Sequence, residues 1–181
     1  IDSWDVGQGA HDDAGGCVAA WRAVTLIKEL GFRPKRTLRV VLWTNEENGG
    51  RGNKNYRDEH MSELENHILA IESDGGVFAP KGFGFTGSVA ARKIIFEIAD
   101  LLDPIGAGKI TKWGRAADVA PLNDKGVPVM SLLVDDSKYF WYHHTSADTF
   151  DKVDFKEFNN CIAAMAIMSY VVADIDLRLP R

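Results

Sequence analysis

Two periodicities of apolar residues divide the chain into predicted helices and strands. Apolar side chains at intervals of three and four residues predict helices, while short apolar runs rich in Val, Ile and Leu predict buried strands. Glycine and proline separate these elements, and the Gly- and Phe-rich stretch of residues 75–87 is expected to be an irregular connection. The pattern predicts helices over residues 15–30, 53–64, 88–102, 115–125 and 155–175, and strands over residues 37–43, 67–71 and 128–134.

Helices that alternate with buried strands are typical of an α/β fold. Apolar runs without polar alternation indicate strands that are buried on both faces, as in a largely parallel sheet. We therefore expect a three-layer α/β/α arrangement, in which helices cover both faces of one sheet. At 181 residues the chain has the size of one domain, and it shows no internal repeat or linker.

Composition narrows the class of protein. With 45% hydrophobic and 26% charged residues, the chain resembles ordinary globular domains. The net charge of -5 and the scattered Lys and Arg residues argue against a nucleic acid as the main partner. No apolar stretch is long enough to span a membrane. Cys17 and Cys161 lie in apolar helical segments, where buried free thiols are expected and a single disulfide is the alternative.

Two adjacent carboxylates, Glu46 and Glu47, follow the strand predicted at residues 37–43. Ligands bind at the carboxyl ends of strands in open α/β sheets. Adjacent carboxylates repel each other unless a cation or a proton lies between them, so the pair indicates one carboxylate on a metal ion and the other held as a base. A solvated acidic turn, closed by the Asn-Gly-Gly that follows, is the alternative for an isolated Glu-Glu pair.

Three further polar groups occur beside predicted elements. Asp12 and Asp13 precede the first helix, Asp74 follows the second strand, and His143 and His144 lie in an aromatic loop. Taken singly, these residues are typical of a helix cap, a turn and structural histidines. Together with the Glu pair, they supply the carboxylate oxygens and imidazole nitrogens that zinc accepts. The combination predicts a metal site in which one carboxylate could bridge two ions.

In order and spacing, these motifs resemble the co-catalytic zinc exopeptidases, a family that includes leucyl aminopeptidases and glutamate carboxypeptidases. The resemblance runs from end to end of the chain and implies the phosphorylase/hydrolase-like α/β/α sheet of that family. It also implies an exopeptidase that cleaves small peptides, in particular dipeptides with unblocked termini. The motifs are Asp-Ser-Trp at 2–4, Gly-Ala-His-Asp-Asp at 9–13, Glu-Glu at 46–47, Glu-Ser-Asp at 72–74 and His-His-Thr at 143–145 through Asp-Thr at 148–149.

The resemblance implies a role for each matching residue. Asp12 would bridge two zinc ions, Glu47 and His144 would complete the protein ligands of the first ion, and Asp74 would hold the second. Glu46 would be the general base, which takes a proton from the attacking water and passes it to the leaving amine. The zinc ions would polarise the scissile carbonyl and stabilise the charge that develops on its oxygen.

Two positions complete the expected site. His143, beside the ligand, would face the substrate and help to hold the oxyanion. Asp2 would orient a His ligand of the second zinc. In the family that His stands two residues before the Asp, a position immediately before Ile1. We therefore expect residues 1–181 to be the C-terminal portion of a catalytic domain whose first strands and one His ligand lie upstream, with weak or no activity on its own.

Three other classes of function have partial support in the sequence. The main alternative is a catalytically incomplete or non-enzymatic domain on a peptidase fold that acts in protein interaction. Loss of ligands marks such proteins, whereas five expected site residues are present here: Asp12, Glu46, Glu47, Asp74 and His144. A serine hydrolase could use His144 and Asp148, but the chain has no Gly-x-Ser-x-Gly motif. A nucleotide site at Gly7-Gln8-Gly9 lacks a preceding strand. The resemblance further implies a homodimer, and a secreted or lysosomal location.

Overall fold

Four short strands form one sheet in the order β1-β4-β2-β3. In the computed structural model, which describes residues 1–181, β1 is parallel to β4 and β2 is parallel to β3, but β2 and β4 are antiparallel. The predicted α/β fold with a sheet between helices is confirmed. The sheet was expected to be largely parallel and is mixed: two of its three pairings are parallel, and the central one is antiparallel. Only residues 73–79 join β1 to β2, which is too short for the helical crossover that a parallel strand needs, so β2 runs back. The strands are β1 (Ala70–Glu72), β2 (Pro80–Thr86), β3 (Lys109–Thr111) and β4 (Val129–Val134).

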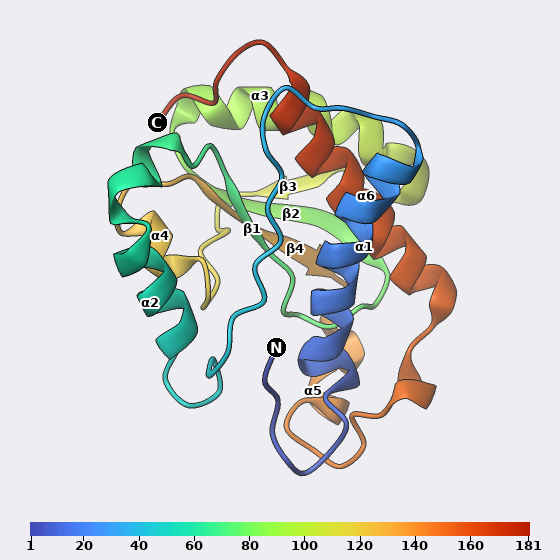
Figure 1. Ribbon diagram of the computed structural model, residues 1–181. Coiled ribbons are helices and arrows are strands. Elements are labelled where there is room, and N and C mark those ends of the chain that lie inside the picture. The colour runs from blue at the N-terminus through green and yellow to red at the C-terminus, as the bar shows by residue number, and fades with distance from the viewer.

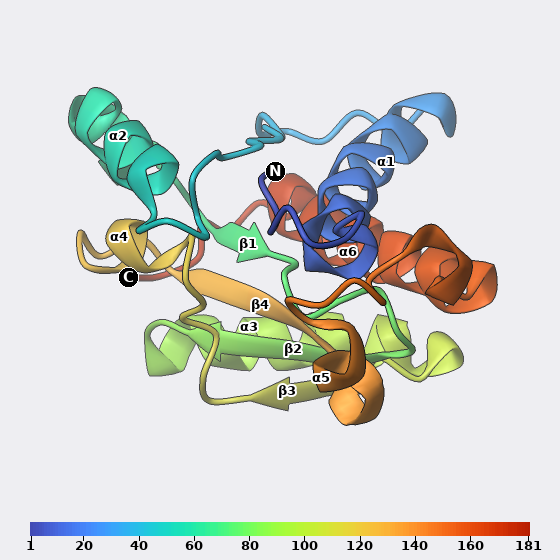
Figure 2. The ribbon, with the colours of Figure 1, turned by 90° about the horizontal axis from the view of Figure 1, so that it is seen from below.

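Helices lie on both sides of this sheet (Figure 1). Figures 1 and 2 both place α1 and α6 together on one side and α2 and α4 on the other. The first and last predicted helices are confirmed, and the helix predicted at residues 53–64 is divided into α2 and a 3-10 turn over Met61–Asn66. None of the helices has the length and apolar character needed to cross a bilayer. The helices are α1 (Gly15–Glu29), α2 (Arg51–Glu59), α3 (Val89–Ala99), α4 (Ala120–Asn123), α5 (Tyr139–Tyr142) and α6 (Phe155–Asp174).

Strand β2 lies inside the sheet, although its sequence predicted an irregular connection. Phe83 and Phe85 are fully buried and join the main apolar core. The glycines that alternate with them allow the close approach of neighbouring backbone. A Cβ at Gly82 would lie 1.8 Å from the carbonyl oxygen of Lys109, and one at Gly84 would lie 1.9 Å from that of Trp113. The loop interpretation was wrong because these glycines serve close packing and not a turn.

Residues 37–43 also differ from their prediction. They run beside β1 in Figure 1 but form no regular strand, and their backbone makes no hydrogen bond to a neighbouring strand. The apolar pattern is that of a strand, yet pairing requires a partner within about 4.8 Å, and none is present on either side. The prediction of a strand here is therefore wrong for this chain, although the reason is a missing partner and not the local sequence.

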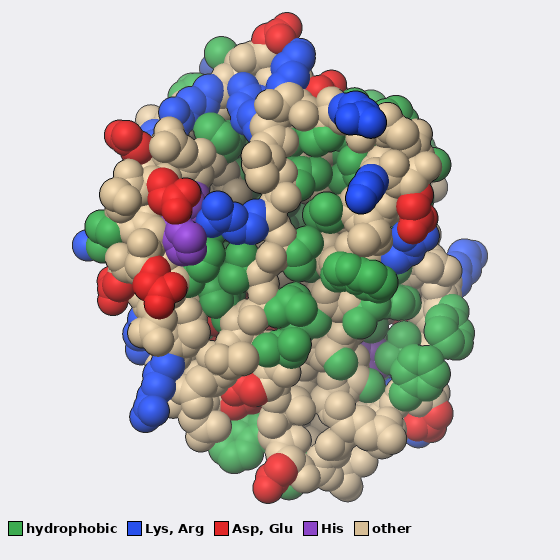
Figure 3. All heavy atoms as spheres, in the orientation of Figure 1, with side chains coloured by type: hydrophobic (Ala, Val, Ile, Leu, Met, Phe, Trp, Pro, Cys, Tyr) green, Lys and Arg blue, Asp and Glu red, His purple; other side chains and the backbone are tan.

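An open groove separates this segment from β1. It has a volume of about 650 Å³, its two sides are residues 36–43 and residues 66–71, and α1 and α6 contribute apolar side chains such as Ala23 and Val172. Figure 3 shows apolar side chains gathered on this face of the molecule. Leu42 is 43% exposed and Trp43 Nε1 has no hydrogen-bond partner. The groove is thus largely apolar, and the backbone of residues 37–43 along one side is free to form hydrogen bonds with an added strand.

Candidate metal centre

The loop before α1 carries Asp12. Gly9 begins this loop with a φ of 62°, and a Cβ there would lie within 2.6 Å of the side chain of Ser3, so glycine is required. Asp12 is 8% exposed, and its Oδ2 accepts no hydrogen bond. Asp13 accepts a hydrogen bond from the backbone N–H of Gly16 at 3.1 Å. The carboxylate of Asp13 thus bonds the first turn of α1, although the N-cap position itself is Ala14. Oδ2 of Asp12 is buried and accepts no hydrogen bond.

Glu46 and Glu47 lie in a tight turn between residues 37–43 and α2. Asn45 has a φ of 64°, and its carbonyl accepts a hydrogen bond from the N–H of Gly50 at 2.8 Å. The side chain of Glu47 is 6% exposed, and its Oε1 has no partner. Burial, followed by the charge of Glu47, raises the pKa of Glu46. The turn therefore brings two carboxylates into a partly buried position.

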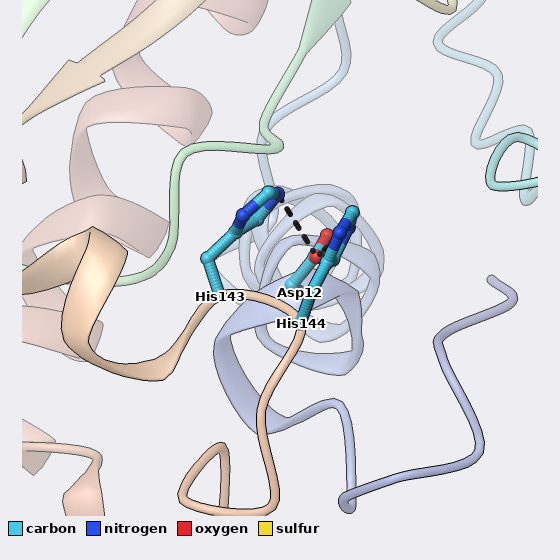
Figure 4. A group of neighbouring side chains, drawn as sticks. All are labelled: Asp12, His143 and His144. Atoms are coloured by element: carbon cyan, nitrogen blue, oxygen red, sulfur yellow. Dashed lines mark ion pairs between the residues drawn. The ribbon is translucent and has the colours of Figure 1, made fainter.

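His143 and His144 follow α5 and face Asp12 (Figure 4). Nε2 of His144 lies 3.1 Å from Oδ2 of Asp12 and 3.1 Å from Oε2 of Glu47. Nε2 of His143 lies 3.5 Å from the same oxygen of Asp12, and the two imidazole rings stack with centroids 3.6 Å apart. The donor atoms of Asp12, His143 and His144 all lie within 4.8 Å of one another. Four residues predicted from the sequence thus converge at one place.

Asp74 lies next to this group, after β1. Burial raises its pKa to about 8, and the negative charges of Glu72, Asp12 and Glu46 add to the effect. Its donor atoms are outside the group that Asp12 forms with the two histidines. Asp74 is therefore close enough for electrostatic repulsion by the other carboxylates, but it is not part of the group with the histidines.

Two carboxylates that sequence reasoning did not single out belong to the same region. Burial raises the pKa of Glu72 to about 7, although its Oε2 accepts a hydrogen bond from the N–H of Val119 at 2.8 Å. Burial and the charge of Glu46 raise the pKa of Asp118 to about 6. Asn53, which is 4% exposed, donates to Asp118 at 3.0 Å. Glu72 stands in the Glu-Ser-Asp motif and could have been noticed, but no pattern marks Asp118 or Asn53.

This arrangement fits a bound cation. None of the carboxylates described in this region pairs with Lys or Arg, and His143 and His144 are the ionisable partners of Asp12 and Glu47. Tetrahedral zinc, with bonds of about 2.0–2.1 Å, holds its ligand atoms about 3.3 Å apart, close to the observed spacings of 3.1 Å from His144 to Asp12 and Glu47. Oδ2 of Asp12 and Oε1 of Glu47 are buried and accept no hydrogen bond, so both are available as ligands of such an ion.

Asp2 has a different contact from the one expected. Its Oδ1 accepts a hydrogen bond from the backbone N–H of Glu46 at 2.9 Å. The roles of Asp2, Glu46 and the metal ligands stay predictions.

Comparison with known proteins agrees with this geometry. Residues 1–169 match the sequence model of peptidase family M28. Over all 181 residues, the chain is 50% identical to carboxypeptidase Q of Bos taurus and 49% identical to carboxypeptidase Q of Homo sapiens. It spans 38% of the length of these two relatives.

Two solved structures are similar to this fold. A peptidase M28 precursor from Shewanella amazonensis superposes with a TM-score of 0.95 at 36% identity, over 99% of this chain and 41% of that one. A zinc aminopeptidase from Bacillus subtilis has a TM-score of 0.77 at 16% identity, over 97% of this chain and 45% of that one, and so shows a shared fold.

Proposed function

This chain belongs to peptidase family M28, and we propose that it forms part of a zinc-dependent exopeptidase that hydrolyses small peptides. The observation that carries the proposal is the convergence of Asp12, Glu47 and His144. Nε2 of His144 lies 3.1 Å from Oδ2 of Asp12 and 3.1 Å from Oε2 of Glu47. Similarity to carboxypeptidase Q supports dipeptides with unblocked termini as the substrate class.

The same geometry supports a set of metal ligands. Asp12, Glu47 and His144 would hold one zinc ion, and Asp12 together with Asp74 would hold part of a second site. Bound zinc would activate water and polarise the scissile carbonyl. Burial, followed by the charges of the neighbouring carboxylates, raises the pKa of Asp74 to about 8, and a bound cation would relieve the repulsion between these carboxylates.

Glu46 would act as the general base. It lies beside Glu47 without sharing its contact to His144, and its amide is fixed by Asp2. A base works best when its pKa lies near the working pH, and burial raises the pKa of Glu46 in that direction. The side chain of His143 is half-buried, and its Nε2 lies 3.5 Å from Oδ2 of Asp12. An N–H group beside the metal ligands in this way could hold the substrate oxygen.

The open groove has room for a further strand of the catalytic domain. We propose that, in the whole protein, a strand from outside residues 1–181 fills this groove. The groove is apolar and is bounded by the unpaired backbone of residues 37–43 and by β1, which pairs with another strand on one side only. A strand placed there would pair on both sides and extend the sheet. The greater length of the relatives supports such a contribution.

The metal site can be tested on this chain directly. Zinc per chain would be measured after dialysis for the wild type and for a Glu47→Ala/His144→Ala double variant. A His60→Ala/Glu63→Ala double variant is the matched control, because it removes the same two donor types from a hydrogen-bonded pair at 2.6 Å outside this site. Zinc that the first variant loses and the control retains would support the site. A folded wild type that binds no zinc would contradict it and favour a peptidase-like interaction domain.

The substrate class requires the whole protein. Dipeptides with free termini would be compared with the same dipeptides acetylated at the amino end or amidated at the carboxyl end. Hydrolysis of the unblocked form alone is the expected result, and equal hydrolysis of all three would contradict the proposed specificity.

A further inference from the structure

Asp148 is a buried carboxylate close to the metal centre. It is 3% exposed. Its Oδ1 accepts a hydrogen bond from the backbone N–H of His11 at 2.7 Å, and its Oδ2 accepts one from the backbone N–H of Asp12 at 3.0 Å. It forms no ion pair with Lys, Arg or His, and the bonds to its carboxylate come from backbone N–H groups. Both oxygens of one side chain therefore hold the backbone that carries Asp12.

Asp148 also belongs to the segment that carries His144. The N–H of Gln8 donates to the carbonyl of Asp148 at 3.0 Å, and the N–H of Phe150 donates to Oε1 of Gln8 at 2.9 Å. A Cβ at Gly7 would lie 2.6 Å from the carbonyl oxygen of Thr145, so the two backbones pack without a side chain between them. Residues 7–12 and residues 144–150, which are far apart in the sequence, are thus joined by a set of hydrogen bonds.

The ring of His11 supports this junction from the other side. It is fully buried and stacks on Phe78 with centroids 4.1 Å apart and on Tyr142 at 5.6 Å. Its Nδ1 accepts a hydrogen bond from the N–H of Val77 at 3.3 Å. The backbone of His11 is therefore held by packing, and the N–H groups that point at Asp148 have a fixed direction.

We propose that Asp148 is a positioning residue that fixes the carboxylate of Asp12 relative to His144 for metal binding. The inference rests on the proposed metal site. Without Asp148 the backbone N–H groups of His11 and Asp12 would be buried without an acceptor, and the loop would have to move. Because Asp12 and His144 come from the two joined segments, any such movement changes the spacing of the ligand atoms. A carboxylate is the side chain that accepts two N–H groups at once, since an amide in its place would present an NH₂ group to one of them.

The experiment compares zinc affinity in three forms of the chain. Asp148→Asn keeps the size of the side chain and loses one acceptor. Asp151→Asn is the matched control, because Asp151 is an exposed aspartate of the same segment. Residues that orient metal ligands typically contribute 10–100-fold to metal affinity, so we expect Asp148→Asn to weaken zinc binding by about that factor and Asp151→Asn to leave it unchanged.

Two further readouts separate positioning from a purely structural role. The rise in melting temperature on adding zinc and the visible spectrum of the cobalt-substituted protein should both change in Asp148→Asn. A purely structural role would lower the melting temperature of the metal-free protein and leave the zinc-induced rise and the spectrum as in the wild type. That result, or an unchanged zinc affinity, would overturn the inference.

A second variant covers the case in which Asp148→Asn does not fold. Asp148→Glu keeps the charge and both acceptor oxygens but displaces them by one methylene, and we expect it to weaken zinc binding as well. Wild-type affinity in Asp148→Glu would show that charge and not position matters, and would contradict the inference. A wild type that binds no zinc is a different outcome, since it would contradict the proposed metal site itself.

Discussion

The carboxylate of Asp2 accepts a hydrogen bond from the backbone N–H of Glu46 at 2.9 Å, which ties the first residues of the chain to the proposed general base. The backbone nitrogen of Ile1 adds a second contact, to the carbonyl oxygen of Trp43 at 2.6 Å. The turn that carries Glu46 and Glu47 therefore depends on a segment more than forty residues away in the sequence. In this structure the contact of Asp2 is thus to the residue proposed as the base.

Replacing Asp2 tests this contact. Asp2→Ala leaves the N–H of Glu46 without its acceptor, and a hydrogen bond to a charged group contributes about 1.5–3 kcal/mol. Because Asp2 is half-buried, we expect a loss of about 1 kcal/mol in the free energy of unfolding and faster hydrogen exchange at the amide of Glu46. Asp2→Asn keeps an acceptor oxygen and should retain most of the protection. Equal protection in Asp2→Ala and the wild type would show that the contact does not hold the turn.

The raised pKa values predict how stability changes with pH. Burial raises the pKa of Glu72 to about 7 and that of Asp74 to about 8, so the folded state binds these protons more tightly than the unfolded state does. Their contribution to stability is complete below the ordinary carboxyl pKa of about 4 and is lost as the pH rises towards 8. Each proton difference gives a slope of about 1.4 kcal/mol per pH unit. His11, whose pKa is lowered by burial, acts in the opposite direction, but only below about pH 6.5.

Urea unfolding of the metal-free protein at several pH values between 6.5 and 8 measures this slope. We expect stability to fall with rising pH, and Asp74→Asn to reduce the slope because it removes one titrating group. Saturating zinc should flatten or reverse the dependence, since a cation favours the charged carboxylates. Stability that rises with pH in the metal-free protein would contradict the assignment of these pKa values.

The glycines of β2 give a stability prediction. A Cβ at Gly84 would lie 1.9 Å from the carbonyl oxygen of Trp113, which is backbone and cannot move aside alone. We expect Gly84→Ala to destabilise the protein by about 2–3 kcal/mol, as overpacked sites do. Gly75→Ala is the control, because its Cβ would meet only a methyl of Val134 at 3.7 Å. Chemical denaturation would measure the free energy of unfolding of the two variants. Equal stability would show that β2 can shift away from its neighbour.

The contrast between β2 and β4 shows what the sequence could and could not predict. Residues 128–134 are apolar and β-branched, and β4 formed where the pattern predicted it. In β2 the same strand geometry requires glycine at Gly82 and Gly84, and glycine in a sequence indicates a loop far more often than a close backbone contact. Local pattern therefore predicted strands whose side chains pack, and missed the strand whose backbone packs.

The candidate site shows a similar division. Asp12, Glu47 and His144 have residue types that are themselves metal ligands, so their chemistry was visible in the sequence. Asp148 acts through its contacts to backbone N–H groups, and such contacts depend on how two distant segments fold together. Residues that support a site are therefore harder to predict from sequence than residues that form it.

The open groove leads to a prediction on hydrogen exchange. In the 181-residue chain the amides of residues 38–43 have no backbone acceptor, so we expect them to exchange at close to the rate of an unfolded peptide. Amides of β4 in the same molecule, which pair with β1 and β2, should be strongly protected and serve as the internal reference. In a longer form of the protein, a strand in the groove would protect residues 38–43 to a level comparable with β4.

Protection that appears in the 181-residue chain only at high protein concentration would instead show that a second copy fills the groove, as exposed strand edges often allow. Protection at every concentration would mean that residues 37–43 pair within the chain and that the groove needs no added strand.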